Sequence, residues 1–450
     1  MPNPFRFFAS GKDKPTLDDR EKIDKLYKRS RLSIILVITI GYGFAYPLRL
    51  VLSVIKKPLI DGGIFSADEL GMIGSALFYV YAFGKLTNGF LADHANIKRF
   101  FATGVLVSAL INLAMGWSTL LWVWVILWGL NGWFQGFGAP TGAVALSNWF
   151  SNRERGRYYG IWSVAHSVGE GLTFLVVAPL VSYFGWQAGF WGPGIFCIFV
   201  AVGIYLFLQD RPQTLGLPSV ADWKNDHSKV ILNSEGEPEK TSKLQLSIFK
   251  LPSIWVLGLA SATMYMTRYA INSWGILYLQ EAKGYSLIEA GGLIGVSTLA
   301  AILGSVAYGF ISDKLFNARR PPVTLIFGLL EVFALFIIFF ASSGKPVLLT
   351  IGFILYGFTL SGILAALGGL FAIDIAPKRA AGAAMGFIGV FSYIGAAVQD
   401  QISGLLIEHG TTVINGIRHY DFSNVIVLWI GSSIVSLILA SSLWRVKVGN

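Results

Sequence analysis

Long runs of apolar residues dominate this chain and limit the folds that are open to it. Hydrophobic residues fill 54% of its 450 positions, and charged residues fill only 13%, whereas soluble domains carry roughly 25% charged residues. About 20 apolar residues cross the hydrocarbon core of a bilayer as a helix. In lipid, only helices and closed barrels satisfy their own backbone hydrogen bonds. The runs therefore predict an all-α protein that crosses a membrane many times.

Twelve segments are long and apolar enough to be such spans. We expect them at 32–54, 69–92, 100–117, 120–146, 157–183, 187–208, 252–279, 286–312, 322–342, 346–373, 380–408 and 423–444. The long polar stretch between the sixth and seventh spans is rich in charge and contains three prolines, so we interpret it as a linker. The predicted domains are a tail (1–31), a six-helix bundle (32–208), the linker (209–251) and a second six-helix bundle (252–445).

The distribution of lysine and arginine indicates how these spans are oriented. The termini and the loops on their side hold 27 of the 35 basic residues, and the opposite loops hold 5. By the positive-inside rule, we expect both termini and the linker in the cytoplasm. This bias, together with contact with anionic membrane lipid, accounts for the net charge of +10. The basic residues are spread over loops without a nucleic-acid-reading motif, so nucleic acid is not an expected partner.

An internal repeat divides the spans into two halves. GFLADHANIKR (89–99) follows the second span, and GFISDKLFNARR (309–320) follows the eighth, at an offset of 220 residues. The segments 154–169 and 380–395, which enter the fifth and eleventh spans, match at an offset of 226. Two parallel six-helix halves with a site at their interface describe the major facilitator architecture. The sequence therefore predicts that fold, with two pseudo-symmetric halves.

The two repeated loops carry a glycine, an acid and basic residues at matching places. An acid and a base that pair across the helix ends can latch one conformation of the protein. The alternative is a generic helix-end turn, with glycine as the cap and the basic residues serving topology. The candidate gating residues are Gly89, Asp93, Arg99, Gly309, Asp313 and Arg319.

Two arginines lie inside apolar spans at matching places of the repeat. Arg49 and Arg268 are 219 residues apart, and Tyr46 and Tyr265 precede them by three positions each. A charge at the bilayer centre costs at least about 2.5 kcal/mol, so an arginine there indicates a functional site. The pair predicts one anion held between the halves. The alternative is that an arginine pairs with a buried acid or extends to the membrane interface.

Other polar residues within the spans are candidates for the same site. His166 either binds and titrates with an anion or is a core histidine bonded to a backbone carbonyl. Glu170 shares its helix face, and we expect it to balance a nearby cation or to relay a proton. Lys85 either steers anions or extends to the cytoplasmic interface. Asp400 is expected to pair with a base or to lie near the outer mouth, and Glu331 is not assigned to the site.

The chain resembles one family along nearly its whole length. The resemblance is clearest in GWFQGFGAP (132–140), NWFSNRERG (148–156), SVAHSVG (163–169), DRPQTLGLP (210–218), SDKLFNARRP (312–321) and APKRAAGAAMGF (376–387). These segments are similar to those of the organophosphate–phosphate antiporter family of the major facilitator superfamily. That family includes glycerol-3-phosphate and hexose-6-phosphate transporters and a sugar-phosphate sensor. The resemblance implies a bacterial inner-membrane protein.

The same resemblance implies which residues bind the substrate. The family's binding positions fall on Arg49, Arg268, His166, Lys85, Tyr265 and Tyr269, and the repeat adds Tyr46. The implied substrate is a phosphate monoester, hexose-6-phosphate first and glycerol-3-phosphate next, which exchanges with inorganic phosphate by alternating access. For each tyrosine, the alternative is a packing role alone.

The chain also departs from the family pattern at five positions. Leu50 and Val144 stand where basic residues are usual, and Ser273 and Thr298 stand where acids are usual. Glu170 replaces a usual glycine. The loss of two bases and two acids leaves the net charge of the site roughly unchanged. These departures leave the organic group of the substrate open.

The remaining chemistry points away from catalysis. The sequence shows no nucleophile–base set, phosphate-binding loop or metal cluster, so we expect no enzyme activity, no cofactor and no metal site. The leading interpretation is a monomeric secondary transporter that exchanges an organophosphate for phosphate. Two alternatives remain open: a membrane sensor that binds sugar phosphate, and a proton-coupled organic-anion symporter that uses His166 and Glu170.

Overall fold

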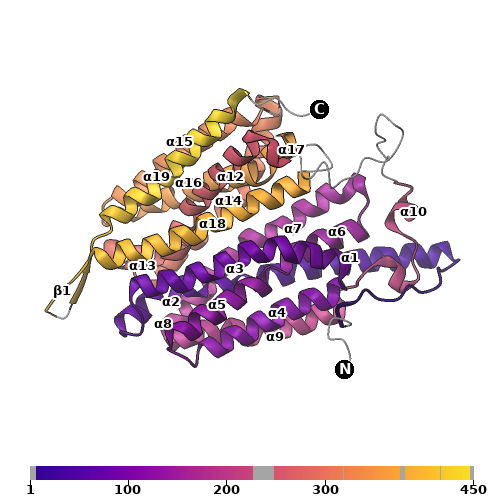
Figure 1. Cartoon of the computed structure of the whole chain (residues 1–450), viewed down its shortest axis with the longest axis horizontal. Coiled ribbons are helices and arrows are strands. Elements are labelled where there is room, and N and C mark those ends of the chain that lie inside the picture. Colours follow the sequence, from indigo (N-terminus) through magenta and orange to yellow (C-terminus); the bar gives the residue numbers. More distant parts are fainter. Residues whose placement is uncertain (1–6, 227–247, 318, 376–380, 416, 446–450) are drawn as a thin grey trace.

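The computed structural model describes residues 7–226, 248–317, 319–375, 381–415 and 417–445. Nearly all of the described chain is helical, and the long helices run alongside one another (Figure 1). Several sequence predictions fall partly outside the described residues, which omit part of the tail 1–31, the linker 209–251 and the family segment 376–387, residue 318 of the loop 309–320, and the first residue of the span 380–408.

The first half of the chain folds into a bundle of long helices, several of which are interrupted. Its elements are α1 (Arg20–Ala45), α2 (Pro47–Asp61), α3 (Ala67–His94), α4 (Ile97–Met115), α5 (Leu121–Gln135), α6 (Gly138–Trp149), α7 (Asn152–Leu172), η2 (Thr173–Val177), α8 (Ala178–Phe184) and α9 (Trp186–Phe207). Two short helices follow, η3 (Pro212–Leu215) and α10 (Val220–Lys224).

The second half repeats this pattern. Its elements are η4 (Ile248–Lys250), α12 (Pro252–Tyr269), η5 (Ala270–Trp274), α13 (Gly275–Lys283), α14 (Leu287–Leu315), α15 (Arg320–Phe340), α16 (Pro346–Ala365), η6 (Ala366–Leu370), α17 (Phe371–Ile375), α18 (Ala381–His409), β1 (Thr411–Ile414), β2 (Ile417–Tyr420), α19 (Ser423–Ser442) and η7 (Leu443–Arg445). The antiparallel hairpin of β1 and β2 projects from one end of the molecule (Figure 1). No strands are expected there from the sequence.

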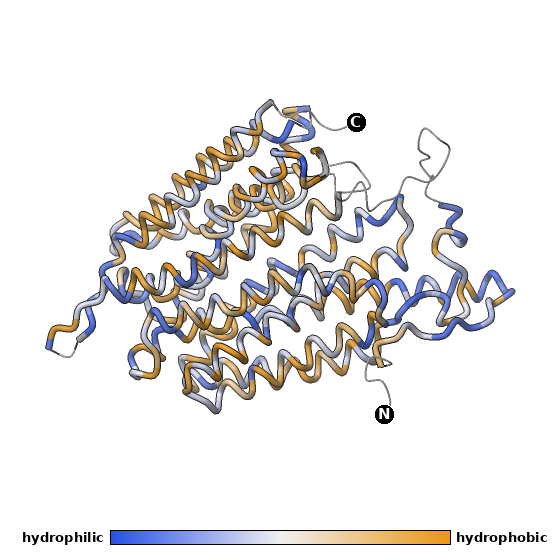
Figure 2. Tube along the Cα trace, viewed as in Figure 1, coloured by the Kyte–Doolittle hydropathy of each residue, from blue (hydrophilic) through white to orange (hydrophobic). Residues whose placement is uncertain are grey.

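The prediction of an all-helical membrane protein is confirmed. Within the described part of the chain, nine helical stretches are long and apolar enough to cross a membrane, or ten if the bent helix α3 is one span. The two other predicted spans, 120–146 and 252–279, correspond to α5 with α6 and to α12 through α13, which do not meet that combination of length and hydropathy. Apolar residues follow the helices of both halves, and polar residues gather towards their ends (Figure 2).

The repeat seen in the sequence reappears at the starts of two equivalent helices. Ser66 and Glu69 form a capping box at α3, and Ser286 and Glu289 form one at α14, 220 residues later. In each box the glutamate accepts the backbone N–H of the serine, at 2.9 and 2.8 Å. The box satisfies N–H groups that the helix leaves unpaired at its start. The same local chemistry therefore starts the second long helix of each half.

Several helices are interrupted near their middle, beside the residues predicted to be functional. Pro47 separates α1 from α2, since proline has no N–H to continue the helical ladder, and Arg49 lies in the first turn of α2. The π-helical turns η2 and η5 begin three residues after Glu170 and two residues after Arg268. Such turns widen a helix locally and occur frequently at functional sites.

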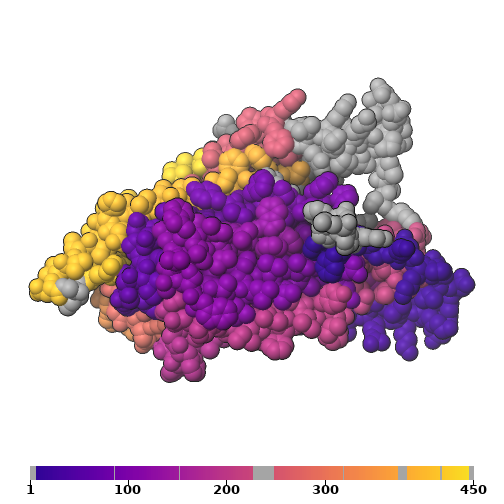
Figure 3. All heavy atoms as spheres, turned by 60° about the horizontal axis from the view of Figure 1, so that its bottom comes forward, coloured from indigo at the N-terminus to yellow at the C-terminus, as the bar shows by residue number. Residues whose placement is uncertain are grey.

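The two halves form adjoining masses (Figure 3) and meet tightly at the end where α2 and α13 lie. We call this the closed end. Here α3 of the first half packs on α18 of the second half. A Cβ atom at Gly74 would lie 1.7 Å from Oδ2 of Asp400, and one at Gly404 would lie 2.5 Å from the carbonyl oxygen of Ala67. Only glycine allows the two helices to approach this closely.

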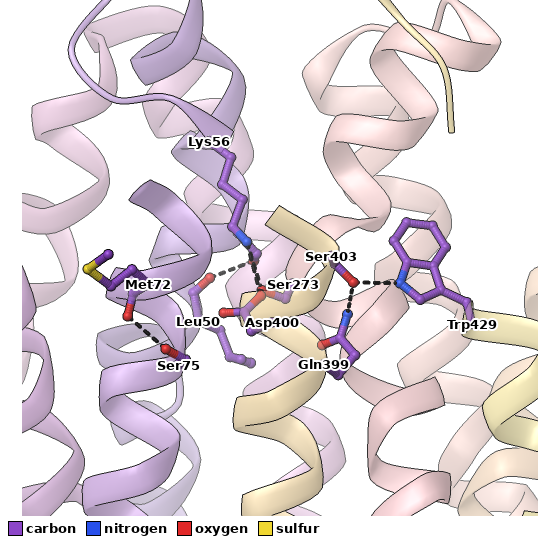
Figure 4. Close-up of polar contacts among 10 residues, drawn as sticks. Leu50, Lys56, Met72, Ser75, Ser273, Gln399, Asp400, Ser403 and Trp429 are labelled. Atoms are coloured by element: carbon purple, nitrogen blue, oxygen red, sulfur yellow. Dashed lines mark hydrogen bonds and ion pairs between the residues drawn. The ribbon is translucent and has the colours of Figure 1, made fainter. Parts of the chain in front are cut away.

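A buried ion pair joins the halves at the closed end (Figure 4). Nζ of Lys56, in α2, lies 3.2 Å from Oδ1 of Asp400 and 3.0 Å from Oγ of Ser273, and both charged side chains are at most 1% exposed. Ser273 also donates to Asp400 at 2.5 Å. The helix extends seven residues beyond the predicted span 32–54, since α2 continues to Asp61. The second half supplies the partners that allow Lys56 to be buried.

Neutralising one partner of this pair will destabilise the protein. Asp400→Asn leaves the Lys56 ammonium buried without a counter-charge, which costs about 3–5 kcal/mol. We expect a clearly lower melting temperature of the purified protein in detergent. The double variant Lys56→Met/Asp400→Asn should recover most of the loss, because no unpaired charge is then buried.

The control for this prediction is Asp313→Asn, which breaks a half-exposed pair with Arg320. Such surface pairs are worth about 0–1 kcal/mol, so its melting temperature should barely change. Equal melting temperatures for Asp400→Asn and the wild type would contradict the proposed importance of the buried pair.

Candidate functional site

A cavity of about 620 Å³ lies between the two halves. His166 and Glu170 of α7 line it from the first half, and Arg268 and Asn272 line it from the second half. From these residues the cavity extends to Gly309, near the end of α14 that lies away from the closed end. The wall is mainly apolar, and several hydroxyl-bearing residues interrupt it, among them Ser163, Ser167, Tyr265, Ser297, Thr298 and Tyr356.

Both ring nitrogens of His166 have a partner, one in the second half and one in the first half. Nη2 of Arg268 lies 2.7 Å from Nε2 of His166, and Oη of Tyr46 contacts Nδ1. A guanidinium group only donates hydrogen bonds, so Nε2 must be the acceptor. The ring is therefore neutral, with its proton on Nδ1, and it donates that proton to Tyr46. The hydroxyl proton of Tyr46 is then directed towards some other acceptor.

Arg268 belongs to a buried ion pair between the halves. Its Nη2 donates to Oε2 of Glu170, and Nδ2 of Asn272 donates to Oε1 of the same carboxylate. Both members of the ion pair are buried. Of the cations considered for Glu170 from the sequence, Arg268 is therefore its partner in the structure.

Arg49 is buried with aromatic rings around it. Its side chain is only 5% exposed, and its guanidinium carbon lies 3.9 Å from the ring centre of Tyr46 and 5.6 Å from that of Tyr81. Within the described residues, its Nε and Nη2 atoms have no hydrogen-bond partner. A buried cation with unpaired N–H groups is costly. Arg49 therefore has N–H groups without a partner in the described chain, although it does not line the cavity.

A cluster of tyrosines extends from the arginines to α3 and α18. Nζ of Lys85 lies 5.1 Å from the ring centre of Tyr393. The ring of Tyr393 is 4.3 Å from that of Tyr81 and 5.4 Å from that of Tyr265, and Tyr265 is 6.2 Å from Tyr269. The structure thus places the predicted residues Lys85 and Tyr265 against one aromatic group, Tyr393, with Tyr269 beside Tyr265.

The predicted gating residues lie at or near helix ends. Asp313 forms an ion pair of 2.7 Å with Arg320, whereas Arg319 is an exposed residue at the start of α15. Arg99 donates to the backbone carbonyl of Phe7 at 2.8 Å. Asp93 is exposed in the last turn of α3. Gly89 and Gly309 lie in α3 and α14, with open space where a side chain would be.

Three residues near the predicted site are not singled out by the sequence pattern. Tyr393 follows Ser392, the repeat equivalent of His166 at the offset of 226, so the repeat offers a signal for it. Lys56 is seven residues after Arg49, which places it on the same helix face. Asn272 has no comparable signal, because its contact with Glu170 depends on the π-helical turn η5.

The departures from the family pattern have varied environments. Leu50 is buried in one apolar cluster, and Val144 packs against a different apolar cluster, formed within the first half. Ser273 is the bridge between Lys56 and Asp400 at the closed end, away from the cavity. Thr298 lines the cavity and donates to the carbonyl of its own helix at 2.7 Å.

The other buried reactive groups lie outside the cavity. Glu331 of α15 accepts a hydrogen bond from Ser433 at 2.9 Å. The thiol of Cys197 contacts the carbonyl oxygen of Phe44 at 3.1 Å. In the part of the chain that the structure describes, no three His, Cys, Asp or Glu side chains gather in a way that could hold a metal ion.

Comparison with known proteins identifies relatives along most of the chain. The family model of the Major Facilitator Superfamily matches residues 29–399. The chain is 35% identical to the membrane sensor protein UhpC of Escherichia coli K12, over 87% of this chain and 89% of that protein. It is 33% identical to a probable hexose phosphate transport protein of Chlamydia pneumoniae, over 87% and 88%. It is 34% identical to the glycerol-3-phosphate transporter of Bacillus subtilis 168, over 95% of both chains.

Solved structures show the same fold at much lower sequence identity. A bacterial homolog of the human lysosomal transporter Spinster, in an inward-facing and unoccupied conformation, superposes with a TM-score of 0.74 at 15% identity, over 94% of this chain and 99% of that one. The predicted major facilitator fold is thereby confirmed. The family model and these relatives together show that the chain belongs to the major facilitator superfamily.

Proposed function

We propose that the protein carries a phosphate monoester across the membrane in exchange for inorganic phosphate, with the phosphate held between Arg49 and Arg268. The main observation behind this is the state of Arg49, which is buried with two unpaired N–H-bearing nitrogens. A guanidinium offers two parallel N–H groups to two phosphate oxygens and keeps its charge at any physiological pH. Hexose-6-phosphate is the first candidate substrate and glycerol-3-phosphate the second, since one relative is named a probable hexose phosphate transport protein and another a glycerol-3-phosphate transporter.

Alternating access would follow from the position of the two arginines in different halves. An anion that binds both arginines draws the halves together. The anion can contact both guanidinium groups only when the two halves are close. The cavity that extends away from the closed end is then the entry path in this conformation. With both termini in the cytoplasm of a bacterium, as the charge bias of the loops favours, that path would lead to the cytoplasm.

Exchange is favoured over net transport for an electrostatic reason. An empty site with unbalanced cations resists closure, because like charges repel when water is removed. Moving one net charge across 100 mV is worth about 2.3 kcal/mol. The exchange of two anions of equal charge moves no net charge, so the membrane potential neither favours nor opposes it.

A second candidate function is sensing, in which ligand binding is signalled to a partner protein. The relative at 35% identity is named a membrane sensor. The segment after α9 is also held firmly against α1: the rings of Tyr27 and Trp223 stack at 4.0 Å, and Trp223 donates to Asp24 at 2.6 Å. Such a fixed surface outside the bundle suits a protein partner. Ligand binding with little flux would favour this alternative.

Replacement of either arginine by lysine will remove exchange. Lysine keeps the charge but loses the two-pronged geometry, which we expect to weaken phosphate binding roughly tenfold to hundredfold. Counterflow of labelled phosphate into phosphate-loaded liposomes should fall below a tenth of the wild-type rate in Arg49→Lys and in Arg268→Lys. Arg153→Lys, at a largely exposed side chain, is the control and should match the wild type. Retained exchange in both site variants would exclude the two-arginine site.

The coupling mode is tested with the same liposomes. Uptake of labelled hexose-6-phosphate should require phosphate inside the vesicles and should not respond to an imposed pH gradient. Uptake into phosphate-free vesicles that follows a proton gradient would instead indicate symport through His166 and Glu170. Ligand binding without uptake under either condition would indicate a sensor.

A further inference from the structure

Glu170 places a negative charge where the organic part of a phosphate ester would lie, if the proposed function holds. Its carboxylate comes from α7 in the first half and bonds to Arg268 and Asn272 in the second half. The side chain lines the cavity and is nearly buried. A phosphate on Arg268 must therefore share that guanidinium with Glu170 or displace it. In either case the group attached to the phosphate lies beside a carboxylate.

The net charge of the residues in and near the cavity determines which ligand charge it can balance. Arg268, Glu170 and His166 line the cavity, whereas Arg49 and Lys85 lie outside its lining, against Tyr46 and Tyr393. The three cations bring three positive charges, Glu170 brings one negative charge, and His166 is neutral by its hydrogen bonds. The sum is +2. A phosphate monoester carries a charge between −1.5 and −2 at pH 7, roughly, so it balances the site. A ligand that has a carboxylate in addition to its phosphate brings about one further negative charge that no cation of this set balances.

The groups next to Glu170 suit hydroxyl-bearing ligands. Asn272, Ser167, Ser297 and Thr298 line the same wall with amide and hydroxyl groups. Thr298 approaches the residue that follows Glu170 in the chain, since a Cβ atom at Gly171 would lie 2.7 Å from its hydroxyl oxygen. An ionised carboxylate can only accept hydrogen bonds. An alcohol can donate to it, whereas a second carboxylate cannot donate and is repelled.

From this arrangement we infer that Glu170 determines specificity: it selects phosphate esters of neutral polyols, such as sugar and glycerol phosphates, and rejects phosphates that also carry a carboxylate. Glu170 acts through direct contact with the organic group of the ligand. This inference concerns the ligand alone, so it applies to a transporter and to a sensor equally.

Glycerol-3-phosphate and 3-phosphoglycerate form a matched pair of probes, because they differ only by a terminal alcohol in place of a carboxylate. Binding of each is measured by calorimetry on the full chain in lipid nanodiscs, with inorganic phosphate as the reference ligand. The wild type should bind glycerol-3-phosphate at least tenfold more tightly than 3-phosphoglycerate. Glu170→Gln keeps the size of the side chain but removes its charge, and it should reduce that preference at least roughly tenfold.

Glu331→Gln is the matched control, because Glu331 is also a buried acid of the described chain but lies outside the cavity. Its preference should equal that of the wild type. Glu170→Ala provides a second variant in case glutamine disturbs folding, and it should lose the preference in the same direction. An unchanged preference in a folded Glu170 variant that still binds phosphate overturns the inference and leaves the proposed function standing. A wild type that binds neither ester nor phosphate overturns both.

Discussion

Positive charge buried between two helical halves is the constraint on which the rest of the site depends. The fold offsets that cost differently for each arginine. Arg268 is neutralised by Glu170 and shares a hydrogen bond with His166, whereas Arg49 is covered by tyrosine rings and keeps N–H groups without a partner in the described chain. Because a ring face attracts a cation only weakly compared with an anion, Arg49 remains available. The guanidinium group of Arg49 therefore lacks a partner in the described chain, whereas that of Arg268 already has one.

The same principle keeps the closed end together. Lys56 and Asp400 would be very costly to bury alone, yet together with Ser273 they form a satisfied cluster that exists only while the halves touch. The glycines of α3 and α18 make this contact short enough. If the proposed exchange is correct, the opposite conformation must hydrate these two charges separately. The cluster would then set part of the free-energy difference between the two conformations.

Sequence reasoning was most reliable where a signal was local or repeated. The apolar runs gave the helices, and the repeat placed Arg49 and Arg268 at equivalent positions, both of which lie buried beside a helix interruption. It was less reliable where a partner comes from another helix. Lys56 falls outside the predicted span 32–54, because a lysine without a visible counter-charge is expected in a loop. Its counter-charge, Asp400, is 344 positions away in the chain. Asp313 pairs with Arg320, the first residue of α15, and not with Arg319, which caps that helix. Composition alone does not indicate which of two neighbouring arginines faces the acid.

By itself, the sequence determined that this chain is a membrane-embedded protein with two related helical halves, because span length, hydropathy and repetition are properties of contiguous residues. It also determined which residue types carry charge into the spans. The tertiary structure alone decided how those charges are used. It paired Glu170 with Arg268, left Arg49 open, and brought Tyr393 among the arginines and Lys85. Such choices depend on distances of a few ångströms between helices far apart in the chain, and the packing of the two halves sets those distances.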